Sequence, residues 1–330
     1  MNEINNLLLD IYHASQNTCV SEFSDKIFSL IKREINFDSG GFCDFNTSDT
    51  SGIKLLSAAA HNISTYDKLH ARQNYLEPEF VEGQNKLTSA DPSLAMAFKN
   101  KGNSVTLSVY DKGIKSNVAA YGIKTECIQT MVMVLAPPMP NRFQTLSLWR
   151  RKNNAEYVQN DNCKANIIFP HVFQAFAINR QIHRISEVKN PVNGTAICSL
   201  EGALLFIDDV AVDFLSREFH SWIPPFLPSI LLENLRSTSE KIYIGKLFVL
   251  TSRRQKDLLF LNFRKTITFE NLSPTELVIA EMLVRNETYK AIAQKLGNQP
   301  ATVRNQAHSI YSKFGISGKA ELAKIINQIR

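Results

Sequence analysis

Residues 272–316 read LSPTELVIAEMLVRNETYKAIAQKLGNQPATVRNQAHSIYSKFGI, and this segment predicts three short helices. Ser273 is a suitable cap for the first helix, Pro274 suits its first position, and Glu276 can reach back to the N–H of the cap. The start and stop signals of the next two helices are Thr288, Gly297, Pro300 and Gly315. Two helices joined by a short turn that contains glycine form the helix-turn-helix arrangement.

The predicted third helix, residues 300–314, has two different faces. Its apolar residues recur at helical spacing and should be buried: Val303, Ala307, Ile310 and Phe314. The opposite face presents Arg304, Asn305 and His308 near the start of the helix. A helix fits the major groove of DNA, and Arg and Asn suit bidentate contacts with guanine and adenine edges. The segment therefore predicts a helix that reads DNA.

The charge distribution supports an anionic partner for the same region. Residues 251–330 hold 13 Lys and Arg against 6 Asp and Glu, a net charge of +7. Residues 1–250 have a net charge of −1, so the positive excess of the 330-residue chain lies in its C-terminal part. Nucleic acid is the first partner to consider for a basic module on a neutral body, and a solvated basic surface is the alternative.

Five segments of this region resemble the LuxR-type (GerE-like) helix-turn-helix family of DNA-binding transcription regulators. They are LSPTE at 272–276, KAIAQKL at 290–296, TVRN at 302–305, IYSKFGI at 310–316 and AEL at 320–322. The match covers residues 267–330 without gaps. It implies an all-α domain of four helices, in which helix 300–314 lies in the major groove and the fourth helix spans residues 318–329.

The resemblance also implies roles for individual residues. The positions that would face bases are those of Arg304, Asn305 and His308. The positions that would lie near phosphates are those of Lys290, Thr302 and Lys313. The positions in the dimer contact on DNA are those of Ala320, Ala323 and Ile326.

The chain departs from the family pattern just before and within the third helix. Asn298 and Gln299 stand where an apolar residue and then Ser or Thr are usual, and Gln306 stands where His is usual. Because Gln is a poorer helix cap than Ser or Thr, the start of the third helix loses about 1 kcal/mol.

Residues 1–186 predict helices, strands, a helix, more strands and a long exit helix. Asp91 and Pro92 mark the start of the central helix, and the exit helix at 164–186 has an apolar stripe that includes Phe169 and Ile182. Strands are expected near 41–45, 54–60, 105–110, 128–135 and 143–150. This order resembles a GAF-type sensor domain, and an unrelated α/β domain is the alternative.

Residues 187–266 differ in character from the region before them. Two apolar runs flank Glu201 and Gly202, which predicts a hairpin, and a helix should begin near Asp208 or Asp209. This pattern resembles the opening of a PAS-type domain, and a hairpin-rich linker domain without a pocket is the alternative. No internal repeat is visible in the sequence.

Several function classes lack support in the sequence. The five cysteines are scattered without C-x-x-C spacing, which favours a reduced, cytoplasmic setting over disulfides or a zinc site. No apolar run is long enough to span a membrane. No His spacing predicts a metal site, and no Walker, dinucleotide or nucleophile motif appears. The tryptophan- and tyrosine-rich pattern of acyl-homoserine-lactone sensors is also not visible.

The sequence thus predicts a multidomain α+β protein, with a GAF-like sensor domain at 1–186, a PAS-like domain at 187–266 and a LuxR-type DNA-binding domain at 267–330. Its expected function is that of a signal-responsive transcription regulator that binds double-stranded DNA as a homodimer. The effector would be an unidentified small molecule or a protein, and no cofactor or metal is expected. One alternative is a protein-interaction or dimerisation module whose helix-turn-helix has lost DNA binding, and an enzyme is a more distant one.

Overall fold

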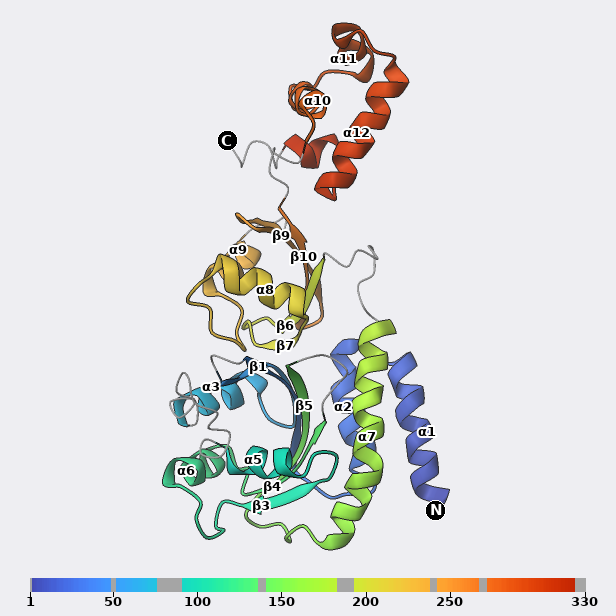
Figure 1. Cartoon of the computed structure of the whole chain (residues 1–330). Helices are drawn as coiled ribbons and strands as arrows, with labels where there is room; N and C mark the ends of the chain where they lie inside the picture. The colour runs from blue at the N-terminus through green and yellow to red at the C-terminus, as the bar shows by residue number, and fades with distance from the viewer. Residues whose placement is uncertain are drawn as a thin grey trace.

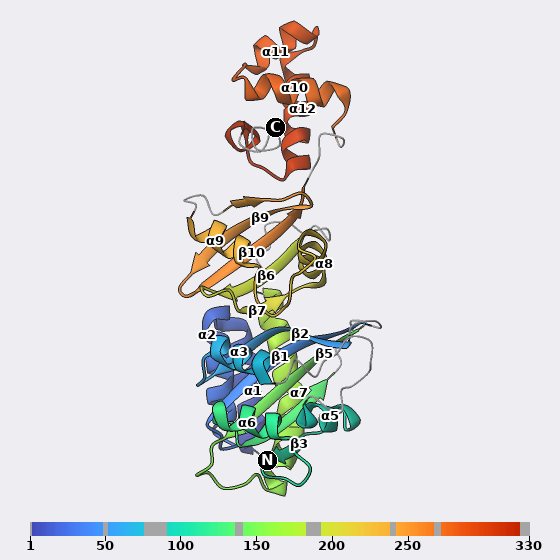
Figure 2. The ribbon, with the colours of Figure 1, turned by 90° about the vertical axis from the view of Figure 1, so that its left-hand side faces the viewer.

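The computed structural model describes residues 2–48, 52–75, 91–135, 141–182, 193–237, 242–266 and 272–323. In this part of the chain, three bodies follow one another along the long axis of the molecule (Figures 1 and 2). The first two bodies are each built on an antiparallel sheet, and the third consists of helices. The predicted α+β fold class is therefore confirmed.

The first sheet has strand order β2-β1-β5-β4-β3. Its strands are β1 Ser39–Ser48, β2 Gly52–His61, β3 Val105–Ser108, β4 Gln129–Leu135 and β5 Arg142–Arg150. Most side chains of β4 and β5 are buried, because helices cover both faces of the sheet. All five strands predicted for this region are present, with ends that differ by a few residues.

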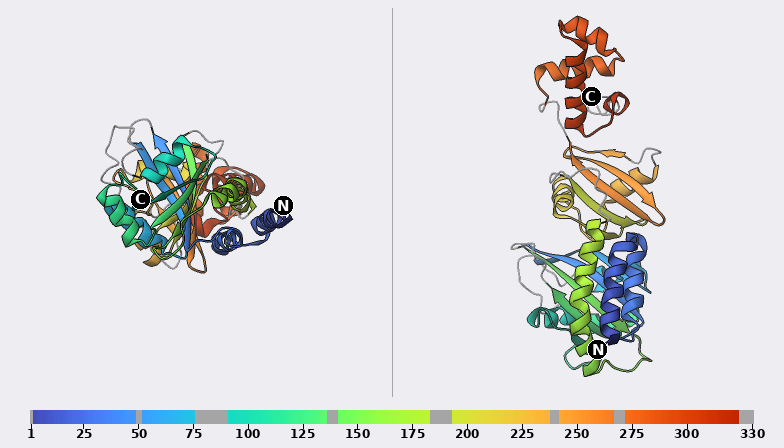
Figure 3. Two further views of the ribbon diagram at one scale, coloured as in Figure 1. Left: turned by 90° about the horizontal axis from the view of Figure 1, so that it is seen from below. Right: turned by 90° about the vertical axis from the view of Figure 1, so that its right-hand side faces the viewer.

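Three helices lie on one side of the first sheet (Figure 3). They are α1 Asn2–Asn17, α2 Val20–Ile31 and α7 Gln159–Ile182. Helices α2 and α7 lie against the sheet, and α1 packs on the outside of these two. The ring of Phe176 on α7 stacks on Phe42 of β1 with centroids 4.1 Å apart, inside the largest apolar core. The predicted exit helix is thus confirmed, but Ile182 is 51% exposed because it lies beyond the last buried residue of α7, Asn179. Residues 183–186 of the prediction lie outside the described residues.

The opposite face of the sheet carries α3 Thr65–Tyr75, α5 Pro92–Lys99 and α6 Ser116–Lys124. The predicted cap of α5 is confirmed, since the side chain of Asp91 accepts the N–H of Leu94 at 3.2 Å. Helix α6 was not predicted from the sequence. It begins after Lys115 without a side-chain cap, so it lacks the usual start signal.

The second sheet has strand order β7-β6-β10-β9-β8. Its strands are β6 Gly194–Ser199, β7 Leu204–Ile207, β8 Ile242–Ile244, β9 Phe248–Gln255 and β10 Leu258–Lys265, and its helices are α8 Asp209–Glu218 and α9 Ser229–Ser237. The hairpin predicted at Gly202 (φ 94°) is confirmed, and so is the start of α8, which Asp208 caps. When the strands are numbered within each body, both sheets have the strand order 2-1-5-4-3. This repeat of topology is not visible in the amino-acid sequence.

A cluster of charged side chains, all but that of Asp209 largely buried, joins the two sheet bodies. We call it the interdomain cluster, and its members are Asp44, Arg142, Arg180 and Asp209. Arg142 at the start of β5 lies 2.6 Å from the Asp209 carboxylate at the start of α8 and donates to the carbonyl of Ile207 at 3.3 Å. Within the first body, the Asp44 carboxylate lies 3.3 Å from the guanidinium of Arg180 on α7 and 3.9 Å from that of Arg142.

Candidate nucleic-acid interface

The C-terminal body is built on α10 Pro274–Val284, α11 Tyr289–Leu296 and α12 Pro300–Phe314. The capping box predicted at the start of α10 is confirmed. Ser273 Oγ accepts the N–H of Glu276 at 3.2 Å, and Glu276 Oε2 accepts the N–H of Ser273 at 2.8 Å. This pair satisfies two backbone donors that the helix itself cannot use.

The turn between α11 and α12 also follows the sequence signals. Thr288 caps α11 by accepting the N–H of Ala291 at 3.2 Å, and Gly297 ends this helix in the left-handed conformation with φ 65°. A left-handed residue favours glycine because it has no Cβ to clash. Gln299 occupies the cap position of α12 but makes no side-chain cap bond there. The weak start predicted for this helix is therefore confirmed.

One apolar core holds the three helices together. Ile279 and Leu283 of α10 and Ile292 of α11 are fully or almost fully buried. Helix α12 contributes the four residues predicted for its inner face, Val303, Ala307, Ile310 and Phe314. This packing sets the rotation of α12 about its own axis and so determines which side chains face solvent.

The outer face of α12 carries the residues that were predicted to face bases. Arg304, Asn305 and His308 are all exposed. Among the described residues, none forms an ion pair with Arg304. The guanidinium therefore needs no rearrangement of a partner before it can meet a base edge.

The predicted phosphate-facing residues have different surroundings. Lys290 on α11 and Thr302 in the first turn of α12 are exposed, and no ion pair to Lys290 occurs within the described part of the chain. Lys313 lies near the end of α12, its side chain is 39% exposed, and its Nζ is 2.6 Å from Oε2 of Glu276. A phosphate would therefore have to share Lys313 with this carboxylate.

Glu276 has a role that reasoning from the sequence missed. Besides capping α10, its carboxylate accepts hydrogen bonds from Lys313 Nζ and, at 2.9 Å, from Ser309 Oγ. These bonds fix the C-terminal half of α12 against the start of α10. The hydrogen bond from Lys313 is the main reason that the pKa of Glu276 is lowered to about 2, with the Ser273 N–H adding to the effect. The only sequence signal was the capping box, which does not reveal a second use of the same carboxylate.

Two of the three residues predicted for the dimer contact lie in the described part of the chain. Ala320 is exposed and Ala323 is partly exposed, whereas Leu322 between them is buried in the core. Ile326 lies outside the described residues. The last described turn of helix, residues 319–323, thus presents small side chains outward.

Among the described residues, no three His, Cys, Asp or Glu side chains come together in a way that could hold a metal ion. No helix among these residues combines the length and the apolar character that crossing a membrane requires.

Comparison with known proteins identifies the helical body. Residues 270–326 match the family described as bacterial regulatory proteins, luxR family. No curated protein matches the chain.

Solved structures with a similar chain path have low sequence identity. The N-acylhomoserine lactone dependent LuxR family transcription factor CepR2 from Burkholderia cenocepacia is 10% identical, with 56% of this chain and 99% of that chain covered and a TM-score of 0.40. SdiA from Escherichia coli is 10% identical, with 98% and 94% covered and a TM-score of 0.39. A GAF domain of a two-component sensor histidine kinase from Bacillus halodurans is 13% identical, with 49% and 95% covered and a TM-score of 0.31.

TM-scores this low show nothing about a signal or a ligand. The function of the chain therefore follows from the family match and from the geometry of the helices. The capping box, the two glycine-terminated helices and the exposed Arg304 and Asn305 all lie within the matched residues. The C-terminal domain therefore belongs to the luxR family of bacterial regulatory proteins, and the chain that carries it is a DNA-binding regulator of transcription.

Proposed function

We propose that the chain responds to a signal and controls transcription by laying α12 in the major groove, where Arg304, Asn305 and His308 meet base edges. The observation that carries this proposal is the orientation of α12, because its apolar face is buried and its Arg and Asn side chains are exposed. Arg and Asn are suited to recognise guanine and adenine, respectively.

Phosphate contacts would position this helix on the duplex. Lys290 and Thr302 are exposed and suited to this task, and Lys313 would act there in exchange with Glu276. Two copies of the chain would bind paired half-sites one helical turn, about 34 Å, apart. The dimer contact would use Ala320, Ala323 and Ile326.

The remainder of the chain would receive the signal. In this proposal residues 1–186 form a GAF-like sensor domain, 187–266 a PAS-like domain and 267–330 the DNA-binding domain. The protein would work in the cytoplasm, where its DNA lies, and would have no catalytic activity of its own. The effector would be a small molecule that binds in one of the sensor domains.

The decisive experiment compares two substitutions in the full-length protein. Arg304→Ala should weaken binding to a selected DNA site by about 1–3 kcal/mol and relax the preference at one base position. Lys290→Ala should weaken all sequences alike and make the salt dependence of binding shallower by about one unit. Electrophoretic shifts of the selected site and of its single-base variants, at several salt concentrations, measure both effects.

The matched control is Arg254→Ala, which removes the same charge from an exposed position in the second sheet. It should leave both affinity and base preference unchanged. If Arg304→Ala behaves like this control, α12 does not read the bases. If the unsubstituted protein binds no DNA even at about 50 mM salt, the domain is a docking module, since non-specific DNA binding is strongest at low salt.

A further inference from the structure

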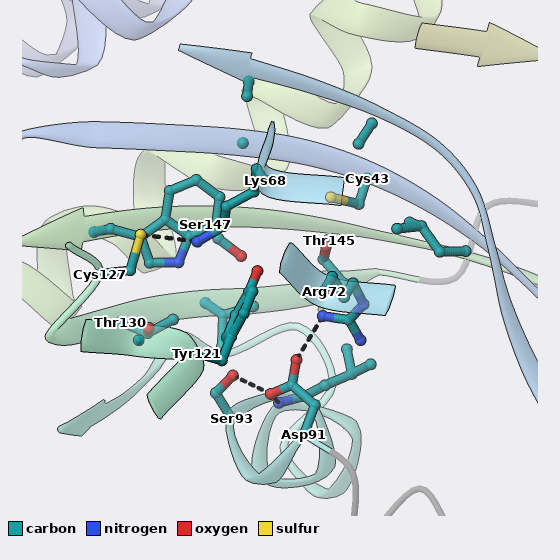
Figure 4. A pocket seen from close by; sticks show the side chains of 18 of the residues that line it. Cys43, Lys68, Arg72, Asp91, Ser93, Tyr121, Cys127, Thr130, Thr145 and Ser147 are labelled. Atoms are coloured by element: carbon teal, nitrogen blue, oxygen red, sulfur yellow. Dashed lines mark hydrogen bonds and ion pairs between the residues drawn. The ribbon is translucent and has the colours of Figure 1, made fainter. Parts of the chain in front are cut away.

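The first body contains a cavity of about 90 Å³ between its sheet and the helices α3 and α6 (Figure 4). Its walls are largely apolar, with Leu and Val side chains from both the strands and the helices. The charged side chains that line it are Lys68, Arg72 and Asp91. The net charge of these three side chains determines which charge a ligand in the cavity should carry.

Arg72 and Asp91 neutralise each other. Arg72 Nη1 donates to Asp91 Oδ2 at 3.0 Å, and the same carboxylate accepts Ser93 Oγ at 2.6 Å (Figure 4). Burial opposes the charge on Asp91, but the Arg72 guanidinium and the hydrogen bonds from Ser93 and Leu94 together outweigh burial and keep the pKa of this carboxyl below its usual value. The pair is therefore ionised and contributes no net charge to the cavity.

Lys68 is a buried cation without a carboxylate partner in the described residues. Its residue exposure is only 7%. The ammonium Nζ lies 2.8 Å from Cys127 Sγ and 3.3 Å from Thr125 Oγ1, above the ring of Trp149 (4.1 Å) and beside that of Tyr121 (4.8 Å). Burial acts against its charge, but contacts with Tyr121 and Cys127 outweigh burial and raise the pKa of Lys68. Hydroxyl, thiol and ring contacts hold this charge in place without neutralising it.

A buried charge is costly unless an opposite charge compensates it. We propose that the cavity binds a small organic monocarboxylate, whose carboxylate pairs with Lys68 and whose apolar tail lies against the sheet. Within the described residues, one positive charge without a carboxylate partner matches a monoanion, whereas a phosphate dianion would leave a buried negative charge.

The size and the walls of the cavity limit the rest of the ligand. A cavity of roughly 150 Å³ holds benzene, so one of about 90 Å³ holds a short chain or, with slight widening, a single ring. This inference rests on the proposed signal response for its biological meaning, but the binding itself needs no DNA.

Fluorescence can report binding directly, because the chain has only two tryptophans and Trp149 lines the cavity. In full-length protein carrying Trp222→Phe, the emission of Trp149 is titrated with butyrate and benzoate and with their uncharged counterparts, butyramide and benzamide. At least one carboxylate should bind ten-fold or more tightly than its amide. If both amides bind as well as their carboxylates, or no compound changes the emission, the proposal is overturned.

The Lys68→Met substitution tests the anchor. It should abolish the preference for carboxylate over amide, because the cation offered to the ligand carboxylate is removed while the apolar stem is kept. The matched control is Lys101→Met, since Lys101 also lies over an aromatic ring, at 5.0 Å from that of Phe98, but is exposed. A preference that survives in Lys68→Met would refute the role of Lys68.

The carboxylate and amide comparison stands even if Lys68→Met fails to fold, because it uses the unsubstituted cavity. These titrations contain no DNA, so a protein that prefers the carboxylate but fails in the electrophoretic shift would keep this inference and refute only the proposed function.

Discussion

The carboxylate of Glu276 joins the start of α10 to the C-terminal half of α12. One of its oxygens accepts the N–H of Ser273 and the ammonium of Lys313, and the other accepts the hydroxyl of Ser309. The side chain is 9% exposed, so solvent offers little replacement for these bonds. The rotation of α12 relative to α10 decides which of its side chains are exposed, and the bonds of Glu276 help to fix that rotation.

Glu276 should therefore make the C-terminal domain sensitive to acid. Its pKa is lowered to about 2 in the folded protein from a usual value of 4.5, so its stabilisation is complete above about pH 4.5 and is lost as the pH falls toward 2. Glu276→Gln should cost on the order of 2 kcal/mol at pH 7 and progressively less below pH 4.5. Hydrogen exchange of α10 and α12 in the full chain, corrected for intrinsic rates, measures this difference.

A second variant, Lys313→Met, tests whether the Lys313 ammonium lowers the pKa of Glu276. Without the ammonium, the pKa of Glu276 should rise toward its usual value, and the acid-induced loss of protection should begin at higher pH. Parallel loss of protection from pH 5 to pH 2 in Glu276→Gln and in the unsubstituted protein would show that this carboxylate does not control the stability of the domain.

Among the helices of the C-terminal domain, α12 is well packed but has no side-chain cap at its N-terminus. Five of its residues are buried in the core, and Gly315 ends it in the left-handed conformation with φ 61°. Its first turn has Pro300 but no side-chain cap, whereas α10 and α11 have caps. The first turn also carries Thr302, which was predicted to lie near phosphate.

Gln299→Ser should stabilise the start of α12 by about 1 kcal/mol, because a serine hydroxyl can accept an N–H that Gln299 leaves without a side-chain acceptor. Exchange protection of the first turn of α12 should rise in the free protein. Thr288→Ala is the reciprocal control, since it removes the existing cap of α11 and should cost about as much. If Gln299→Ser and Gln299→Ala have equal protection, capping does not limit this helix.

In the whole molecule, the cavity and the interdomain cluster share two strands. On β1, Cys43 lines the cavity and the next residue, Asp44, holds the arginines of the cluster. On β5, Thr145 and Trp149 line the cavity and Arg142 reaches across to the second body. A ligand that shifts these strands would therefore move the contact between the two sheet bodies, which is the physical connection that a signal response requires.

The two sides of this contact should differ in their contribution to stability. Arg142→Met should cost about 1–3 kcal/mol, because Asp44 stays buried and keeps only its Arg180 partner. Asp209→Asn should cost about 1 kcal/mol or less, because the asparagine side-chain oxygen can still accept a hydrogen bond from the Arg142 guanidinium. Urea denaturation of the full chain measures both, and equal costs would contradict this asymmetry.

Local signals in the sequence were sufficient to predict the C-terminal domain. Its helix starts and stops, its apolar stripe and the outward face with Arg304 and Asn305 all depend on residues within a few positions of one another, and all are observed. The strands of the first sheet and the hairpin at Gly202 were predicted for the same reason.

Other features exist only because the chain folds back on itself. Lys68 and Cys127 are 59 residues apart, Arg142 and Asp209 are 67 apart, and Glu276 and Lys313 are 37 apart. No periodicity or cap signal connects such pairs, because their proximity follows from strand order and helix packing. The exposed face of α12 could therefore be predicted from the order of the residues, whereas the buried cavity charge and the contact between the sheets arise from tertiary packing alone.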